Sequence, residues 1–184
     1  MKKKMLLHSC CGPCSTACID RLKDDYDLTV FYYNPNIFPQ EEYLHRLNEQ
    51  IRYVKEAGLK ICVIDGKYDD NQAFYQAFSG LENEKEGGAR CSVCFALRLD
   101  KTAKFAKENG YDIFATTLSV SPHKNAQLIN EIGQNLSKKY EIEYLVSDFK
   151  KKDGYLISIR KSKEYNLYRQ NYCGCKYSIY EKNV

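Results

Sequence analysis

Residues 4–23, KMLLHSCCGPCSTACIDRLK, decide the fold, because they join an apolar strand to a helix through a turn rich in cysteine. The pattern predicts a short buried strand over residues 4–8 and a helix over residues 15–23, with Pro13 before the helix. The same order of strand, turn and helix returns along the rest of the chain. Strands that alternate with helices are typical of βαβ units. The sequence therefore predicts an α/β fold with a parallel sheet covered by helices on both faces.

Outside this unit, the sequence predicts further strands and helices in alternation, followed by a helical C-terminal segment. The strands are expected over residues 28–33, 59–64, 112–117 and 142–146, and the helices over residues 41–57, 68–78, 91–109 and 124–139. The C-terminal segment is expected to break near Asp153-Gly154 and near Cys173-Gly174-Cys175. The 184 residues suffice for one hydrophobic core, so we expect residues 1–184 to form a single domain.

Unusual polar residues and cysteines follow the predicted strands. They lie mostly within residues 8–14, 33–40, 65–68 and 117–125. In an open parallel sheet, binding sites form at the carboxyl ends of the strands. We therefore expect these segments to build one site.

Composition excludes several classes of protein. Apolar residues make up 43% of the chain and charged residues 28%, the balance of a soluble globular domain. No stretch approaches the roughly 18 consecutive apolar residues of a membrane span. Lys2 to Lys4 form a basic run, but the apolar residues after it are too few for a signal peptide. We expect a cytoplasmic protein that makes no contact with membranes.

The chain contains nine cysteines, far more than an ordinary cytosolic protein. The odd count, the missing signal and a reducing compartment all disfavour a disulfide framework. Cysteines at this density in the cytosol usually bind metal or carry out redox chemistry.

Positive charge is concentrated in the C-terminal segment, residues 145–184. This segment holds nine Lys/Arg against four Asp/Glu, whereas the first 144 residues hold 19 against 20. Seven aromatic residues are interleaved with these charges. Such a segment suits phosphate contacts and base stacking, although a solvated helical face is the simpler interpretation of the charge alone.

The first chemical motif is Cys10-Cys11-Gly12-Pro13-Cys14, at the predicted turn from strand to helix. The positive end of a helix lowers the pKa of a thiol, and the thiolate is the form that binds metals and attacks electrophiles. Cys11 to Cys14 also match the thioredoxin active-site pattern, which is a weak signal on its own. For Cys18 and Cys62 we expect buried, inert thiols.

The second motif is Arg90-Cys91-Ser92-Val93-Cys94, at the start of a long predicted helix. Together with Cys10 and Cys11 it supplies four thiolates from two loops. Zinc and iron–sulfur clusters both accept four thiolates, and spacing alone does not separate them.

The third motif is Cys173-Gly174-Cys175. One residue between two thiols is tight for joint ligation of a metal, but such thiols can form a strained, easily reduced disulfide. We interpret them as a redox pair; two further metal ligands or a local turn are the alternatives.

Two polar loops complete the candidate site. Residues 116–125 carry hydroxyl groups, His123 and Lys124 between a strand end and a helix start, which suits an anion site or a general acid. Residues 33–39, which include Asn34, form a rigid loop that either shapes a pocket or is only a turn. The sequence has no glycine-rich phosphate loop and no dinucleotide fingerprint. Electrons are therefore expected to arrive through a metal cluster or thiols.

Together these motifs resemble epoxyqueuosine reductase of the QueH type, over about residues 5–180. The resemblance rests on these segments: residues 8–14, residues 33–36, residues 88–94, residues 121–125 and residues 167–175. It implies reduction of the epoxide of epoxyqueuosine to queuosine at the wobble position of tRNA. It also implies a fold related to the adenine-nucleotide α-hydrolase-like group (PP-loop or HUP type), with the cysteine turn in place of a phosphate loop.

The resemblance further implies a set of roles for the residues. A 4Fe–4S cluster is assigned to Cys10, Cys11, Cys91 and Cys94. An additional iron beside the cluster is a feature associated with the family, and Cys14 is the candidate ligand for it in this chain. Cys173 and Cys175 match the family's redox pair. His123 or Lys124 is expected to donate a proton or hold a phosphate. Substrate contacts are expected from Asn34, Arg90, Lys150 and Arg169, and the partners are tRNA and an unidentified electron donor.

Three other functions compete with this one. An iron–sulfur tRNA sulfurtransferase shares the substrate and cluster but needs a phosphate loop, which is missing. A zinc-stabilised RNA-binding module explains four thiolates and a basic tail but leaves Cys173 and Cys175 unexplained. Thioredoxin-like exchange ranks last.

Overall fold

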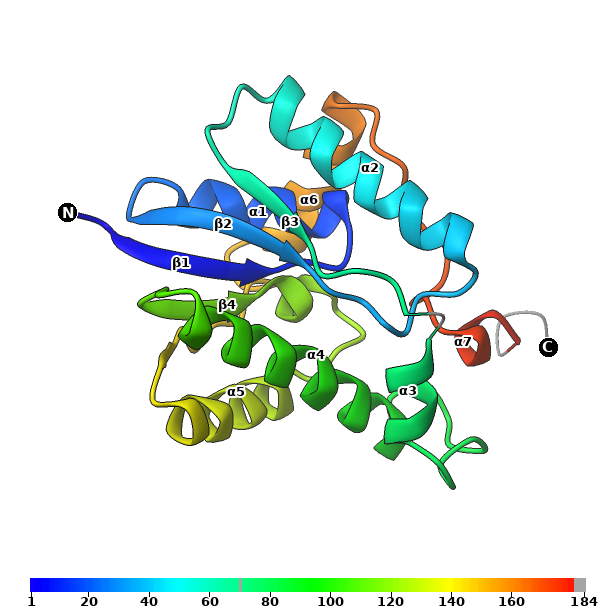
Figure 1. The fold of residues 1–184 in the computed structure, drawn as a ribbon. Helices are drawn as coiled ribbons and strands as arrows, with labels where there is room; N and C mark the ends of the chain where they lie inside the picture. The colour runs from blue at the N-terminus through cyan, green and yellow to red at the C-terminus, as the bar shows by residue number, and fades with distance from the viewer. Residues whose placement is uncertain (70, 181–184) are drawn as a thin grey trace.

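The computed structural model describes residues 1–69 and 71–180 of the chain (Figure 1). Five strands form one parallel sheet in the order β3-β2-β1-β4-β5. Their bounds are Lys3–His8 for β1, Tyr26–Tyr32 for β2, Cys62–Asp65 for β3, Ile113–Thr116 for β4 and Glu143–Tyr144 for β5. The predicted α/β fold is therefore confirmed.

Helices cover both faces of the sheet. They are α1 (Gly12–Leu22), α2 (Gln40–Glu56), α3 (Gln72–Ala77), α4 (Ala89–Glu108), α5 (Ala126–Tyr140), α6 (Gly154–Glu164) and α7 (Lys176–Tyr180), with a 3-10 turn, η1, at Thr117–Val120. Figure 1 shows α1, α2 and α6 on one side of the sheet and α4 and α5 on the other.

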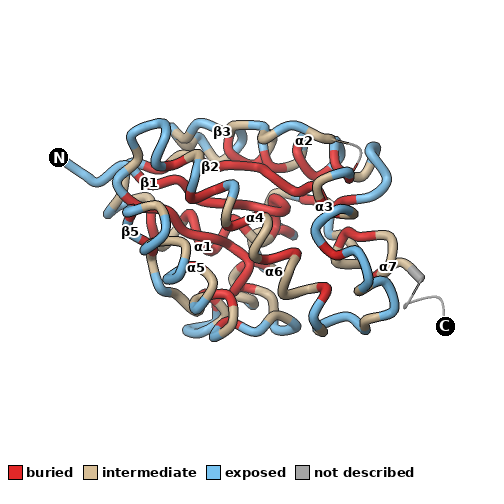
Figure 2. The backbone as a smooth tube through the Cα atoms, turned by 60° about the horizontal axis from the view of Figure 1, so that its bottom comes forward, coloured by how far each residue is buried: buried red, intermediate tan, exposed pale blue. Residues whose placement is uncertain are grey.

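The alternation of side chains along β1 explains this layering. Met5 and Leu7 pack into a core with α1 and α2, while Leu6 points to the opposite core with α4 and α5. Successive residues of a strand face opposite sides, so a central parallel strand buried on both faces is apolar throughout. Figure 2 shows the result as a buried sheet inside a shell of exposed helix surface.

Several boundaries differ from the prediction. Helix α1 begins at Gly12, so Pro13 lies in its first turn, where a missing N–H costs nothing. Strand β5 has only two residues, and the helix expected over residues 68–78 is shortened to α3; residue 70 lies outside the described part. No helix of the described chain is both long and apolar enough to span a membrane.

Cys62 is exposed, which corrects the expectation of a buried thiol. It begins β3, and β3 is an edge strand that pairs only with β2. An edge strand is covered less than a central one, and apolar sequence alone does not reveal which strand lies at the edge.

The C-terminal segment is only partly helical. Asp153 has φ +59 and precedes α6, and Gly174 has φ +136 and precedes α7, so both predicted breaks are present. Between the two helices, residues 167–175 run without helix along α2 and over the carboxyl ends of the strands (Figure 1). We call residues 165–175 the strap. Residues 181–184 of the predicted basic segment lie outside the described residues.

Candidate metal and substrate site

The cysteine turn lies between β1 and α1, at the carboxyl edge of the sheet. The sulfur atoms of Cys10, Cys11 and Cys14 all lie within 4.8 Å of one another. Cys10 and Cys11 are buried and Cys14 is half-buried, and all three are free thiols. Because α1 begins at Gly12, Cys14 lies in its first turn, which brings its sulfur back to the other two.

The three thiols of this turn shift one another's pKa values in opposite directions. Hydrogen bonds from the Cys11 and Cys14 thiols lower the pKa of Cys10 well below its usual value, and the Lys124 and Arg98 charges add to this effect. The same interaction with Cys10 raises the pKa of Cys11 to about 11 and that of Cys14 further. The turn is therefore built to hold an anionic sulfur, which is the form that binds a metal.

His8 fixes the strand ends around this turn. Its Nε2 donates to the Tyr33 carbonyl at 3.0 Å, so Nδ1 accepts from the Thr116 hydroxyl, also at 3.0 Å. Burial lowers the pKa of His8 to about 4, which keeps the ring neutral. His8 thus connects the ends of three neighbouring strands, β2, β1 and β4, directly beneath the cysteines.

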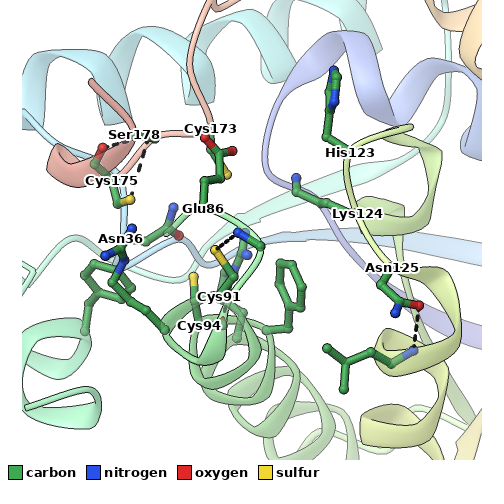
Figure 3. Close-up of a pocket in the computed structure, with 16 residues that line it drawn as sticks. Asn36, Glu86, Cys91, Cys94, His123, Lys124, Asn125, Cys173, Cys175 and Ser178 are labelled. Atoms are coloured by element: carbon green, nitrogen blue, oxygen red, sulfur yellow. Dashed lines mark hydrogen bonds between the residues drawn. The ribbon is translucent and has the colours of Figure 1, made fainter. Parts of the chain in front are cut away.

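Cys91 and Cys94 lie in the first two turns of α4 and face a cavity of about 120 Å³ (Figure 3). The Cys91 sulfur accepts a hydrogen bond from the Gly87 N–H at 3.2 Å. Burial raises the pKa of Cys91, and that of Cys94 to about 12, because a low-dielectric environment disfavours the thiolate. A bound cation would reverse this preference.

Cys173 and Cys175 line the same cavity from the strap (Figure 3). Lys124 lines it from the loop before α5 and, in Figure 3, extends toward the sulfurs, whereas His123 points away along the rim and is exposed. Burial lowers the pKa of Lys124, but the nearby Cys173 and Cys10 sulfurs outweigh it and raise the pKa above its usual value. The ammonium therefore stays charged.

The predicted cysteine ligands lie in two neighbouring groups. Within the described residues, the group of three or more potential ligands at 4.8 Å spacing is Cys10, Cys11 and Cys14, and it does not include Cys91 or Cys94. The charge of Arg98 acts on Cys10 of the turn and on Cys94 of α4, whereas the charge of Lys124 acts on Cys10 of the turn and on Cys173 of the strap. One electrostatic environment therefore spans the cysteine turn and the cavity.

The strap is anchored by a buried arginine of α2. Arg46 donates from Nη1 to the Cys173 carbonyl at 3.1 Å and from Nη2 to the Tyr172 carbonyl at 3.4 Å. Its Nε pairs with Glu42 at 2.7 Å, which compensates the buried charge. The Phe38 N–H also donates to the Gly174 carbonyl, at 2.8 Å. The backbone of the Cys-Gly-Cys motif is thus held independently of its sulfurs.

Glycine is required at position 174. Its φ of +136 is unfavourable for other residues, and a Cβ there would approach Ile37, Asn36 and Arg46 to within 3.3 Å. Further along the strap, the Gln170 amide donates to the Cys11 sulfur at 3.2 Å, so the strap also covers the cysteine turn.

The other predicted substrate-binding residues make contacts within the protein. The buried Asn34 amide donates to the Ser9 carbonyl at 2.9 Å, while its Oδ1 has no hydrogen-bond partner within the part of the chain that the structure describes. Arg90 lies over the Tyr177 ring at 4.4 Å and donates to the Glu82 and Glu84 carbonyls. Arg169 donates to the Ser162 hydroxyl at 3.1 Å. These contacts do not test their predicted roles.

Lys150 belongs to a basic turn, Lys150 to Lys152, that lies beside the cavity. Its Nζ donates to the Lys124 carbonyl at 3.3 Å and pairs with Asp148 at 3.2 Å. Arg21 of α1 donates to the carbonyls of Phe149, Lys151 and Lys152, which directs the exposed side chains of Lys151 and Lys152 outward.

Sequence reasoning missed Arg21, Arg46, Arg98 and Gln170. One local signal existed for Arg98, which follows Cys94 by one helical turn on α4. The others contact residues far away in the chain; Gln170 and Cys11 are 159 positions apart.

Comparison with known proteins identifies the family of this chain. A family model described as epoxyqueuosine reductase QueH matches residues 5–181. The epoxyqueuosine reductase QueH of Staphylococcus epidermidis is 42% identical over 188 residues, covering 100% of this chain and 79% of that protein. The enzyme of Streptococcus pyogenes serotype M1 is 44% identical, covering 97% and 71%. That of Thermotoga maritima is 34% identical, covering 97% and 91%.

Among solved structures, the fold is similar to that of the U34-tRNA thiolase NcsA from Methanococcus maripaludis, which was determined with its 4Fe–4S cluster. The TM-score is 0.52 at 13% identity, covering 97% of this chain and 62% of the thiolase. At this identity the similarity concerns the fold alone.

Proposed function

This chain belongs to the epoxyqueuosine reductase QueH family, and from that premise we propose how its cysteines serve the reaction. It is an oxidoreductase that converts epoxyqueuosine to queuosine in tRNA. Opening the epoxide to an alkene breaks two C–O bonds, forms one C=C bond and releases water. The change consumes two electrons and two protons. The observation that carries the assignment to this cavity is that two pairs of cysteines and one charged lysine line it.

We propose that Cys10, Cys11, Cys91 and Cys94 hold a 4Fe–4S cluster and that Cys14 is the ligand of an additional iron. The donor set fits such a centre: three thiols cluster in the turn after β1, and Cys91 and Cys94 line the cavity together with Lys124 and Arg98. Neither Lys124 nor Arg98 forms an ion pair with a carboxylate of the described residues. When bound, a cluster supplies electrons one at a time. The thiolase that shares this fold carries such a cluster.

Cys173 and Cys175 supply the matching two-electron step. Oxidation of two thiols to one disulfide releases two electrons and two protons, which is the quantity that removal of the epoxide oxygen as water consumes. An external electron donor then reduces the disulfide and returns both thiols. The pair lies across the cavity from Cys91 and Cys94, so thiols, proposed cluster ligands and substrate share one space.

Lys124 holds a proton beside the reacting carbons in this proposal. Its ammonium faces the cavity and stays charged, so it donates a hydrogen bond to the epoxide oxygen and stabilises negative charge as the C–O bond breaks. His123 lies on the exposed rim, where a phosphate of the tRNA is the partner we propose. Substrate contacts by Asn34, Arg90 and Arg169 stay predictions.

The basic turn is proposed to contact phosphates of the anticodon stem, with the wobble base extended from its loop into the cavity. Replacement of Lys150, Lys151 and Lys152 by glutamate is expected to weaken tRNA binding and to reduce the salt slope of log K by about 2–3 if all three contact phosphates. Filter binding or fluorescence titration at several salt concentrations measures both quantities.

A matched control replaces three other lysines by glutamate. They lie near the amino ends of the strands and are Lys2, Lys104 and Lys107. Lys2 precedes β1, and Lys104 and Lys107 lie at the C-terminal end of α4. This variant carries the same change in net charge, so its affinity and salt slope are expected to stay close to those of the parent chain. Equal behaviour of the two variants would remove the basic turn from the tRNA interface.

Metal analysis of anaerobically purified protein tests the cofactor directly. About four or more iron atoms per chain, acid-labile sulfide and visible absorbance that bleaches with dithionite are expected. The loaded protein is then expected to convert epoxyqueuosine in tRNA. One zinc per chain and no colour after anaerobic reconstitution would overturn the cluster and favour a zinc-stabilised RNA-binding module instead.

A further inference from the structure

Arg98 is a fully buried cation for which the proposed reaction has so far assigned no role. It lies on α4 one turn after Cys94, with 1% of its surface exposed. Its Nε donates to the Cys94 carbonyl at 3.2 Å, and its guanidinium lies 5.6 Å from the centre of the Phe95 ring. These contacts fix the side chain but do not neutralise its charge.

Arg98 is one of the residues that line the cavity. Its Nη2 is buried and finds no hydrogen-bond partner among the described residues, and the cavity wall also includes Cys91, Cys94 and Cys173. A buried donor without a partner is rare in folded proteins and calls for an explanation, such as an ion that occupies the site in the working protein.

Arg46 is a second buried arginine of this chain, and its charge is compensated within the protein. It is buried to the same extent as Arg98, but Glu42 lies 2.7 Å from its Nε. Arg98 has no carboxylate partner among the residues that the structure describes. A buried cation without an anion is costly, so the missing anion must be supplied by something else.

The charge of Arg98 acts on both groups of sulfurs. Hydrogen bonds from Cys11 and Cys14 lower the pKa of Cys10, and the Arg98 charge adds to that effect. Burial raises the pKa of Cys94, and the Arg98 charge opposes that rise. Arg98 is therefore the side chain of α4 whose charge links the cysteine turn to the cysteines of α4.

We propose that Arg98 is the internal counter-cation of the cysteine-bound metal centre and that it raises the reduction potential of that centre. The inference rests on the proposed function, because it requires the cysteines to hold an anionic iron–sulfur centre. An added electron makes such a centre more negative, so a fixed positive charge beside it stabilises the reduced state more than the oxidised state. Arg98 is a positioning residue, since it acts through the sulfurs and contacts no substrate.

The test measures the midpoint potential of the anaerobically reconstituted protein by redox titration, followed by electron paramagnetic resonance and visible absorbance. Arg98→Met removes the charge at similar volume, and we expect its midpoint to shift to more negative potential. Arg98→Lys keeps the positive charge, and its midpoint potential is expected to lie close to that of the parent chain. Lys101→Gln, on the exposed side of the same helix, removes a charge of the same sign and is expected to leave the potential unchanged.

Thermal unfolding gives a second readout that does not depend on activity. After removal of the metal by chelation, Arg98→Met is expected to unfold at a higher temperature than the parent, because it no longer buries an unpaired cation. With the metal bound, the order is expected to reverse. A metal-free Arg98→Met protein that unfolds earlier, or fails to fold, would contradict the proposal.

The outcomes separate this inference from the proposed function. If the parent chain binds no iron–sulfur centre, the proposed function fails and this inference fails with it. If the parent binds the centre but Arg98→Met and Lys101→Gln titrate at the parent's potential, only the role of Arg98 is overturned.

Discussion

Replacement of Cys91 by alanine is expected to remove the visible absorbance, most of the bound iron and all measurable reduction of epoxyqueuosine. Cys91 is one of four proposed cluster ligands, and its sulfur lies on the cavity wall where Gly87 N–H orients it. Loss of one thiolate leaves three cysteines for a cluster that needs four ligands. The fold is expected to survive, because Cys91 is only half-buried and the change removes a single sulfur atom.

The measurement compares iron content, absorbance and circular dichroism of the variant with those of Cys62→Ala. Cys62 makes a suitable control because its thiol is exposed at the edge strand β3, away from the proposed ligands. Both variants are expected to show the parent's circular dichroism, and only Cys91→Ala is expected to lose iron. Full iron content and absorbance in Cys91→Ala would contradict the assignment of Cys91 as a ligand and would leave Cys10, Cys11 and Cys14 as the candidate ligands.

Cys173→Ser is expected to keep the cluster and lose turnover. Serine cannot form the disulfide, so the two electrons and two protons of the proposed thiol step are no longer available. The docking of the strap is expected to persist, because Arg46 binds the backbone carbonyls of Cys173 and Tyr172 and not the sulfur. The loss is therefore expected to be chemical rather than structural.

Alkylation of thiols followed by mass spectrometry distinguishes a chemical from a structural cause of the lost turnover. After a single turnover without an external donor, the parent chain is expected to show Cys173 and Cys175 protected as a disulfide. The variant is expected to show Cys175 free, with absorbance and iron equal to the parent. Cys62→Ser serves as the control and is expected to turn over normally. Sustained turnover by Cys173→Ser would exclude a redox role for the pair.

Local patterns predicted most of the fold but misplaced specific boundaries. Each predicted strand appears in the sheet, because buried parallel strands leave apolar runs that are readable from the sequence. Helix α1 begins three residues earlier than the pattern predicts, because Pro is well accommodated in the first turn of a helix and need not precede it. Exposure of Cys62 was missed because the order of strands, which puts β3 at an edge, is a property of the whole sheet.

The candidate site, like the fold, was predictable from the sequence only in part. The sequence placed Cys10, Cys91, Lys124 and Cys173 at segment ends that a parallel sheet brings together, and the structure places them around one region. It did not reveal that Arg46 anchors the Cys173 backbone from 127 positions away. Nor did it show that Arg98 lacks a carboxylate partner within the described structure.

By itself, then, the sequence determined the order of the elements, the family and the residue types available for redox chemistry. These properties depend on periodicity and on motifs within a few residues, which are local. Only the tertiary structure decided that the sulfurs of Cys10, Cys11 and Cys14 lie within 4.8 Å of one another, that the strap covers them through Gln170, and that the charge of Arg98 acts on both sulfur groups. Burial and charge compensation depend on which distant segments pack together, and that information exists only once the chain has folded.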